Sequence, residues 1–411
     1  MSGTDRGGHI ANGERQSEHP LRRSAFRALV QDFGPLWFTW CMNAGVIAEL
    51  LQQCPYEFRG IKIISTIFFV FDLVAFVVFS LIFIARFAWF RREAYYEIVD
   101  NIVDLTLLPC WSIAWLTLTA LVGLIVSRAH WGGHAFALVA YVMWWIAAAW
   151  NLFFLFFAFV TLIRRHKASD QRMPTTIIIP AVSVSTVAVT GGIVVSMSTG
   201  ISARLAVPVI IVAFMYVGIG VLMGLILSVH LFHQLLTFGW PPAELVATLW
   251  IFIGPLGQSA AALQALGSAA NTHGAFAGYN KGTFLTAQAA PALEAACMLI
   301  ALMLTGLGIV WAVLALYAMM ECAYRRELFW APNWNSTIFP TGTLVTAMLQ
   351  FSVAMDSPAF RGVTVGLIII MIAVFLVNMA FAILRISQGK LLIIRDDPRV
   401  KAQMEGEQKS R

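Results

Sequence analysis

Segments of about 20 or more mainly apolar residues recur along most of this chain of 411 residues. A helix of that length is long enough to cross the hydrocarbon core of a lipid bilayer. Hydrophobic residues make up 59% of the chain and charged residues only 12%, whereas a soluble domain carries roughly 25% charged residues. The sequence therefore predicts an all-α integral membrane protein, and it excludes a soluble domain with a single anchor.

The spacing of these segments predicts ten transmembrane helices with a polar tail at each end. We predict a disordered N-terminal tail over 1–30, a transmembrane domain over 31–387 and a C-terminal tail over 388–411. An even number of crossings places both termini on one side of the membrane. The predicted spans are 33–52, 62–89, 103–126, 134–162, 176–198, 203–230, 243–266, 291–320, 333–355 and 362–385.

The basic residues predict which side that is. Most of the 27 Lys and Arg residues lie in the two tails and in the loops on their side, including Arg91-Arg92 and Arg325-Arg326. Cytosolic loops carry an excess of Lys and Arg, so both termini are predicted to be cytosolic. Because the charge of +6 is distributed over helix ends, we expect no nucleic-acid partner. The basic residues predicted to lie outside are Arg59, Lys62, Arg128, Arg204, Lys281 and Arg361.

Five prolines occur in every second span, 71 to 85 residues apart. Their alternation with spans that lack a central proline predicts five two-helix repeats, with broken helices around a central pore. Three of the prolines are predicted to lie well inside their spans, whereas the first and last are equally well explained by ordinary helix starts. The five are Pro35, Pro109, Pro180, Pro255 and Pro340.

Small residues in the same spans are candidates to line this pore. A glycine leaves room for a solute, but it also lets two helices pack closely, and the sequence leaves both uses open. The pore-lining candidates are Gly45, Pro109, Pro180, Gly191, Gly192, Pro255, Gly257, Gln258, Pro340 and Gly342.

Asp72 is the one acidic residue predicted to lie deep in a span. A carboxyl group inside a membrane is costly, so Asp72 is a candidate proton site, and a hydrogen-bonded packing acid is the alternative. The sequence contains no Walker motif, dinucleotide fingerprint or HExxH motif, and no paired acids or nucleophile–base set. We therefore predict no catalytic residue, no cofactor and no metal.

Two stretches resemble motifs of the tellurite-resistance/dicarboxylate transporter family, which includes plant slow anion channels, fungal sulfite efflux pumps and malic acid transport proteins. Ile253-Gly254-Pro255-Leu256-Gly257-Gln258 resembles its GPLGQ-type motif, and the stretch from Trp334 to Gly342 resembles its W-x-x-T-F-P-x-G motif. Weaker similarities lie at 33–38, 54–60 and 142–145, so that the resemblance covers residues 33–387.

The resemblance implies a slow anion channel-like fold with five inner, kinked helices and five outer helices around one pore. It also implies that a phenylalanine of the ninth helix plugs the pore, and Phe339 is the best positional match, with Phe351 a poorer one. Relatives in this family form trimers in which each protomer has its own pore, so a homotrimer is expected.

The chain departs from the family pattern on two helices that are expected to line the pore. The usual M-G-T-G reads Met42-Asn43-Ala44-Gly45, and the usual F-P-M-G reads Leu108-Pro109-Cys110-Trp111. A tryptophan in place of a glycine is expected to narrow or reshape the path. These departures leave the substrate open.

We expect an anion exporter in a fungal plasma membrane that passes sulfite or another small anion. The alternative is a transporter of C4-dicarboxylates such as malate, or of a specialised-metabolite carboxylate, with Asp72 as the site of proton coupling. A membrane enzyme or a receptor is a third class, against which the missing catalytic motifs and the missing ligand-binding domain argue.

Overall fold

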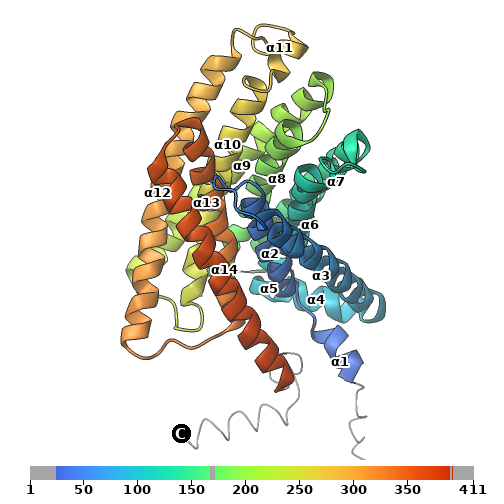
Figure 1. Cartoon of the computed structure of the whole chain (residues 1–411). Helices are drawn as coiled ribbons and strands as arrows, with labels where there is room; N and C mark the ends of the chain where they lie inside the picture. The colour runs from blue at the N-terminus through green and yellow to red at the C-terminus, as the bar shows by residue number, and fades with distance from the viewer. Residues whose placement is uncertain (1–24, 167–171, 389–390, 392–411) are drawn as a thin grey trace, which may run out of the picture.

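The computed structural model describes residues 25–166, 172–388 and 391 (Figure 1). Apart from one isolated β-bridge between Lys281 and Leu285, the regular structure of these residues is helical. Nine helices of this part of the chain are long and apolar enough to cross a membrane. The predicted all-α, multi-pass membrane fold is therefore confirmed.

Five helical units form an inner ring. They contact one another in the order α2, α6, α8, α10, α13 and again α2. Each unit starts with a short helical segment that leads into a longer helix. The units are η1 (Pro35–Trp37) with α2 (Phe38–Gln52), α5 (Ile102–Leu107) with α6 (Pro109–Leu121) and the π-helical turn η2 (Val122–Val126), η3 (Thr175–Ile178) with α8 (Ile179–Met197), η4 (Val246–Phe252) with α10 (Ile253–Ala270), and η5 (Pro332–Thr337) with α13 (Ile338–Ala354).

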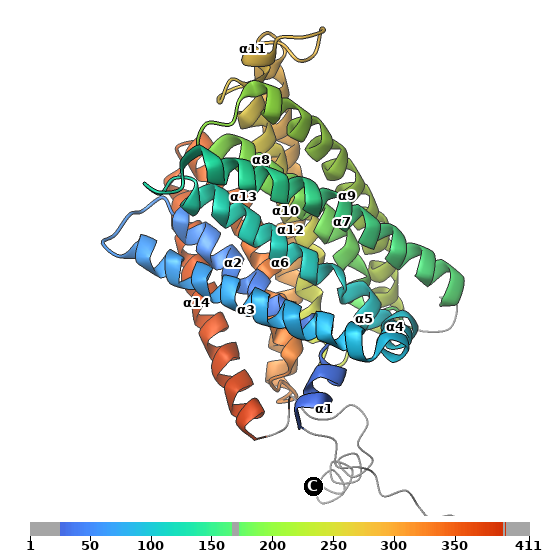
Figure 2. The ribbon, with the colours of Figure 1, turned by 90° about the vertical axis from the view of Figure 1, so that its right-hand side faces the viewer.

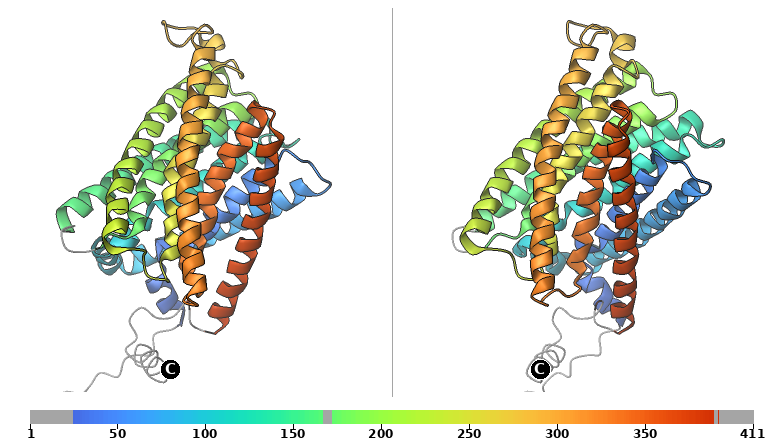
Figure 3. Two further views of the ribbon diagram at one scale, coloured as in Figure 1. Left: turned by 90° about the vertical axis from the view of Figure 1, so that its left-hand side faces the viewer. Right: turned by 60° about the vertical axis from the view of Figure 1, so that its left-hand side comes forward.

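Five long helices surround this ring, and each follows one inner unit in the sequence. They are α3 (Ile61–Trp89), α7 (Gly133–Arg165), α9 (Ala203–Phe238), α12 (Ala290–Tyr324) and α14 (Pro358–Ser387). In their most apolar stretches 22 to 44% of the residues are buried, against 72 to 100% in the inner spans that begin at residues 102, 175, 246 and 332. Figure 3 shows α12 and α14 at the outside of the bundle. The alternation of buried and exposed helices matches the predicted two-helix repeats.

The first predicted span, 33–52, corresponds to η1 and α2. The α-helix itself has 15 residues, which is shorter than the roughly 20 residues of a simple crossing. All of its residues except Glu49 and Gln52 are buried, and it contacts α6 and α13 in the ring. Whether η1 and α2 together form a tenth transmembrane helix therefore stays a prediction.

Pro109, Pro180 and Pro255 do not lie in the middle of a helix as expected, whereas Pro340 lies at a helix start, which is one of the two explanations that its sequence position allows. Pro109 is the first residue of α6, Pro180 the second of α8, and Pro255 and Pro340 the third residues of α10 and α13. A proline in the first turn costs little, because the N–H group that it lacks has no acceptor within the helix. The interruption therefore lies where a short segment meets a long helix, and no long inner α-helix is kinked in its middle by these prolines.

Three short helices lie at the two ends of the bundle. We call the end at which Ala25 and Ser387 lie the termini side; α1 (Ala25–Asp32) and α4 (Arg91–Asp100) are found there, and α11 (Ala275–Tyr279) lies at the opposite end (Figure 2). The predicted disordered tail ended at residue 30, but its described part is helical, because Val30 packs against Phe90 and Ala94. The remainder of that tail and most of 388–411 lie outside the described residues.

Candidate functional site

A small cavity of about 40 Å³ lies inside the ring, near the starts of the inner helices. That volume has room for only about one to three water molecules. Every inner unit contributes to its wall, so the cavity lies inside the ring. One lining residue from each unit, in chain order, is Met42, Cys110, Val182, Ile251 and Phe339.

The wall of this cavity is uncharged. Among the described residues that line it there is no Asp, Glu, Lys, Arg or His, and the polar contributors are Thr39, Asn43, Asn335 and Ser336. The first turns of α6, α8 and α13 all contribute to the wall. A helix N-terminus carries a partial positive charge, which favours an anion. The cavity thus combines three helix starts with neutral polar side chains and has no basic side chain among its lining residues.

Phe339 lies in the wall of this cavity. Its side chain lines the cavity and is only 4% exposed. It is the second residue of α13, where the backbone N–H group has no acceptor within the helix. That N–H group donates instead to Oδ1 of Asn43 on α2, at 3.0 Å. A side chain from another helix therefore fixes the backbone at the residue expected to plug the pore.

Asn43 belongs to a buried chain of amide groups. Its Nδ2 donates to the backbone carbonyl of Asn335 at 3.0 Å, and Oδ1 of Asn335 accepts from Nδ2 of Asn378 at 3.4 Å. The indole of Trp330 donates to Oδ1 of Asn378 at 3.2 Å. All three asparagines are at most 3% exposed. This asparagine chain connects the linker before η5 with α14, η5, α2 and the first turn of α13.

The glycine candidates lie at contacts between helices. A Cβ added to Gly45, Gly192, Gly257 or Gly342 would overlap a side chain of the next inner helix. A Cβ on Gly191 would overlap the indole of Trp144 on α7, which donates to the carbonyl of Val187 at 2.8 Å. The partners of the first four glycines are, in order, Thr117, Ala265, Thr343 and Val46. These glycines let the ring close tightly, which is the packing use that the sequence left open.

Of the eleven residues proposed from the sequence for the pore, only Phe339 and Pro340 line the cavity. Gln258 is buried within α10 and does not contribute to the cavity wall. Pro255 packs against Gly224 of α9, and Pro109 and Pro180 begin their helices without reaching the wall. The structure therefore places only candidates from the start of the ninth predicted span at this cavity, and it separates the other candidates from it.

Asp72 lies between the two layers. Its Oδ2 accepts from the hydroxyl of Thr117 on α6 at 3.0 Å, beside Gly45 of α2, and its Oδ1 has no hydrogen-bond partner among the described residues. The residue is fully buried but does not line the cavity. A buried polar atom without a partner is costly, so Asp72 stays a candidate proton site.

Trp111, which replaces a glycine of the family pattern, does not narrow the cavity. Its indole donates to the hydroxyl of Ser80 on α3 at 2.9 Å and packs against the rings of Phe83 and Trp150 on the outer helices. The expected narrowing is therefore wrong, because the rotation of α6 turns this side chain towards the outer layer.

Sequence reasoning missed the asparagine chain. In the sequence Asn43 stands out only as a departure from the family pattern, Asn335 only as part of a motif, and Asn378 belongs to no motif. An amide group in an apolar helix needs a hydrogen-bond partner, so an asparagine in the last predicted span was a usable signal. Its partners lie 43 and 48 residues away along the chain, which no local pattern reveals.

A ring of buried inner helices around a small uncharged cavity, with an outer layer of exposed apolar helices, is the architecture of a multi-pass membrane protein. The profile of the family described as voltage-dependent anion channel (SLAC1) matches residues 32–383. This match covers most of the chain, which belongs to that family. The resemblance proposed from the motifs is thereby confirmed, and the protein is a membrane anion transporter.

Two fungal relatives are named sulfite efflux pumps. The protein of Arthroderma otae is 26% identical over 354 residues, which is 86% of this chain and 90% of the relative. That of Trichophyton rubrum is 26% identical over 355 residues, with the same coverage of both chains. An uncharacterized transporter of Methanocaldococcus jannaschii is 20% identical over 78% of this chain and 83% of its own length. These names describe transport and not catalysis.

Proposed function

We propose that this protein exports sulfite or another small inorganic anion along the axis of the inner ring. The observation that carries this proposal is the convergence of three helix N-termini on an uncharged cavity. Their partial positive charges favour an anion without binding it as tightly as a buried Lys or Arg would, which allows release. The relatives named sulfite efflux pumps support sulfite as the first substrate to test.

We further propose that Phe339 is the gate. Its ring lies in the wall of a cavity of about 40 Å³, which is too small for an anion together with its hydration shell. An anion can then pass only when the Phe339 side chain leaves the axis. The bond from Asn43 holds the backbone of this residue, so opening requires rotation of the side chain or release of that bond.

The orientation and assembly belong to the same proposal. The excess of Lys and Arg on the termini side supports cytosolic termini, and transport out of the cell then requires the plasma membrane. A homotrimer, in which each protomer has its own path, is proposed on the family resemblance. Labelling of single cysteines placed in the tails, before and after permeabilisation, tests the orientation directly.

Growth of yeast that lacks its own sulfite pump tests the substrate. Expression of this protein should restore growth on sulfite. If a correctly localised protein does not restore growth, sulfite is excluded as its substrate. Malate flux in vesicles, with and without a proton gradient, tests the carboxylate alternative. A malate flux that depends on the gradient, together with no sulfite rescue, would replace the proposal by that alternative.

Anion currents in oocytes test the gate. Phe339→Ala should raise the current roughly tenfold, which corresponds to a barrier lowered by about 1.4 kcal/mol. Phe351→Ala is the matched control, because Phe351 is buried in the same helix but does not line the cavity. Equal currents for the two variants, at equal surface expression, would exclude Phe339 as the gate.

A further inference from the structure

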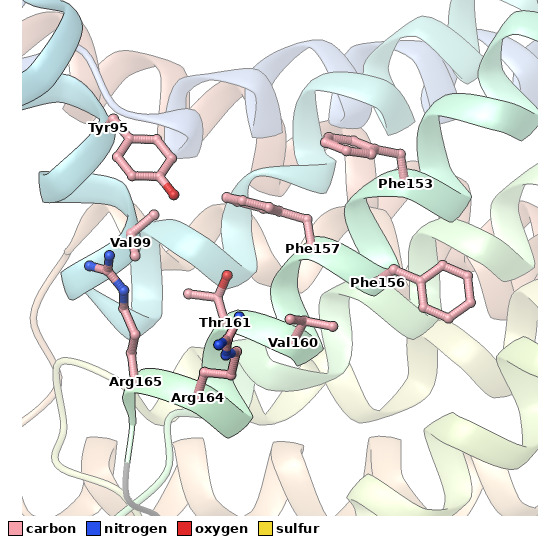
Figure 4. Close-up of a pocket in the computed structure, with 9 residues that line it drawn as sticks. All are labelled: Tyr95, Val99, Phe153, Phe156, Phe157, Val160, Thr161, Arg164 and Arg165. Atoms are coloured by element: carbon pink, nitrogen blue, oxygen red, sulfur yellow. The ribbon is translucent and has the colours of Figure 1, made fainter.

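A groove of about 630 Å³ lies between α4 and α7 on the termini side, far from the small cavity of the ring. Tyr95 and Val99 of α4 form one wall of this groove, and α7 forms the other. Figure 4 shows the phenylalanines of α7 at one end of the groove and two arginines at the other. We name it the α4–α7 groove.

The wall on α7 is one continuous apolar stripe. Phe153, Phe157, Val160 and Arg164 follow one another at intervals of three or four residues, which places them on one face of the helix. Phe153 is 61% exposed and Val160 50% exposed, on a helix that faces lipid. At 1.5 Å per residue the stripe is about 16 Å long, and it ends at a cation.

The charged end of the groove has one arginine without an ion-pair partner. Arg165 donates to Oδ1 of Asp100 at 3.0 Å, and its guanidinium group lies 5.8 Å from the centre of the Tyr96 ring. Among the described residues, none forms an ion pair with Arg164. The hydroxyl group of Thr161, one turn earlier, adds a neutral donor to the same wall. Within the described part of the chain, Arg164 therefore gives this end of the groove an unpaired positive charge.

We propose that the α4–α7 groove binds an anionic phospholipid of the leaflet on the termini side. Its phosphate lies at Arg164, and one acyl chain lies along Val160, Phe157 and Phe153. A soluble anion would leave this apolar stripe unused, and a zwitterionic lipid would bring a second cation next to Arg164. The match of an apolar stripe with one unpaired arginine at its end selects a negatively charged amphiphile.

Native mass spectrometry of the purified full chain tests this site. Phosphatidylserine and phosphatidylcholine with identical acyl chains are added at equal concentration, and the lipid adducts are counted. The wild type should retain several-fold more phosphatidylserine than phosphatidylcholine. In Arg164→Gln this preference should fall to about one.

Arg385→Gln is the matched control, because Arg385 also lies in the last turn of an outer helix on the termini side. Its lipid preference should equal that of the wild type. If Arg164→Gln keeps the preference, or if Arg385→Gln loses it equally, the assignment to this groove is wrong. Each variant is first shown to have the melting temperature of the wild type, and Arg164→Lys, which keeps the charge, should restore most of the preference.

A double variant, Phe153→Ser with Phe157→Ser, tests the acyl-chain half of the site. It should lower the adducts of both lipids without changing their ratio. Unchanged adducts would show that the head group alone is bound, which contradicts the proposal. If the variants change the mass of the protein assembly instead of its lipid adducts, a second copy of the chain occupies the groove and the lipid assignment fails.

Discussion

The outer helices of this protein are more apolar than the inner helices, which is the reverse of the arrangement in a soluble protein. Each outer helix is more apolar in its most apolar stretch than any of the four long inner spans, yet the outer helices are far less buried. In water the most apolar residues are driven inside. In a bilayer the lipid is as apolar as the interior, so small residues and hydrogen bonds decide which helices pack together.

The inner ring uses both small residues and buried hydrogen bonds. Gly192 of α8 lies against the side chain of Ala265 on α10, and Gly257 of α10 lies against that of Thr343 on α13. These glycines let the three helices pack closely. The asparagine chain then holds α2, α13 and α14 together through buried amides. The outer layer is mixed: a Cβ at Gly218, Gly306 or Gly366 would meet no atom within 4 Å, whereas a Cβ at Gly220 or Gly224 of α9 would overlap an inner helix. Glycine is therefore structural at these ring positions and replaceable at those outer positions that have no neighbour.

Replacement of a ring glycine should have the largest effect. Gly257→Val places a branched side chain against Thr343 and the backbone of Leu344. Overpacking of a close-packed core costs about 1–3 kcal/mol and more where backbone must move. We expect most of the folded protein to be lost in fluorescence-detected size-exclusion chromatography. Gly306→Val on α12 is the control and should give the wild-type yield. Similar yields for both variants would contradict the claim that the ring glycine, and not the outer one, is needed for packing.

Removal of the amide that holds the gate should have the next largest effect. Asn43→Ala leaves the N–H group of Phe339 and the carbonyl of Asn335 without their partner, at a cost of about 1–3 kcal/mol. We expect a lower melting temperature and a raised basal anion current. Asn151→Ala removes another fully buried amide, between α7 and α6, and should lower stability without raising the current. A raised current in both variants would mean that general loosening, not the bond to Phe339, opens the path.

The outer end of the asparagine chain should matter less. Trp330→Phe removes the bond to Asn378 but keeps an aromatic ring against Phe381. A neutral hydrogen bond contributes about 0.5–1.5 kcal/mol, and Trp330 is only partly buried. We expect a small fall in melting temperature and a smaller rise in current than in Asn43→Ala. A larger rise would show that the linker, rather than Asn43, controls the gate.

The smallest effect is expected at Asp72. Asp72→Asn keeps the shape of the side chain and an oxygen to accept from Thr117, so stability should change by less than about 1 kcal/mol. Because this residue does not line the cavity, sulfite export should be unchanged. If the flux or its dependence on pH falls strongly, Asp72 carries protons and the carboxylate alternative gains support.

The sequence by itself determined the all-α multi-pass membrane fold and the family, and nine of its ten predicted spans correspond to helices long and apolar enough to cross a membrane. Each of these depends on local properties: a run of apolar residues is long enough to cross a bilayer wherever it occurs, and a motif is read without knowing its neighbours. The alternation of prolines also separated the inner from the outer helices. A helix start was one of the two explanations for Pro35 and Pro340, but it was not expected for Pro180 and Pro255, because the short segments before them look like parts of one span.

Only the tertiary structure decided which side of each helix faces the cavity. Gly45 and Gly192 turned out to face neighbouring helices, and Trp111 turned to the outer layer. The bond between Asn43 and Phe339 joins residues 296 positions apart. The rotation of a helix about its axis is set by all of its packed neighbours together. In a helix that is buried on every side, no polar face in the sequence marks that rotation.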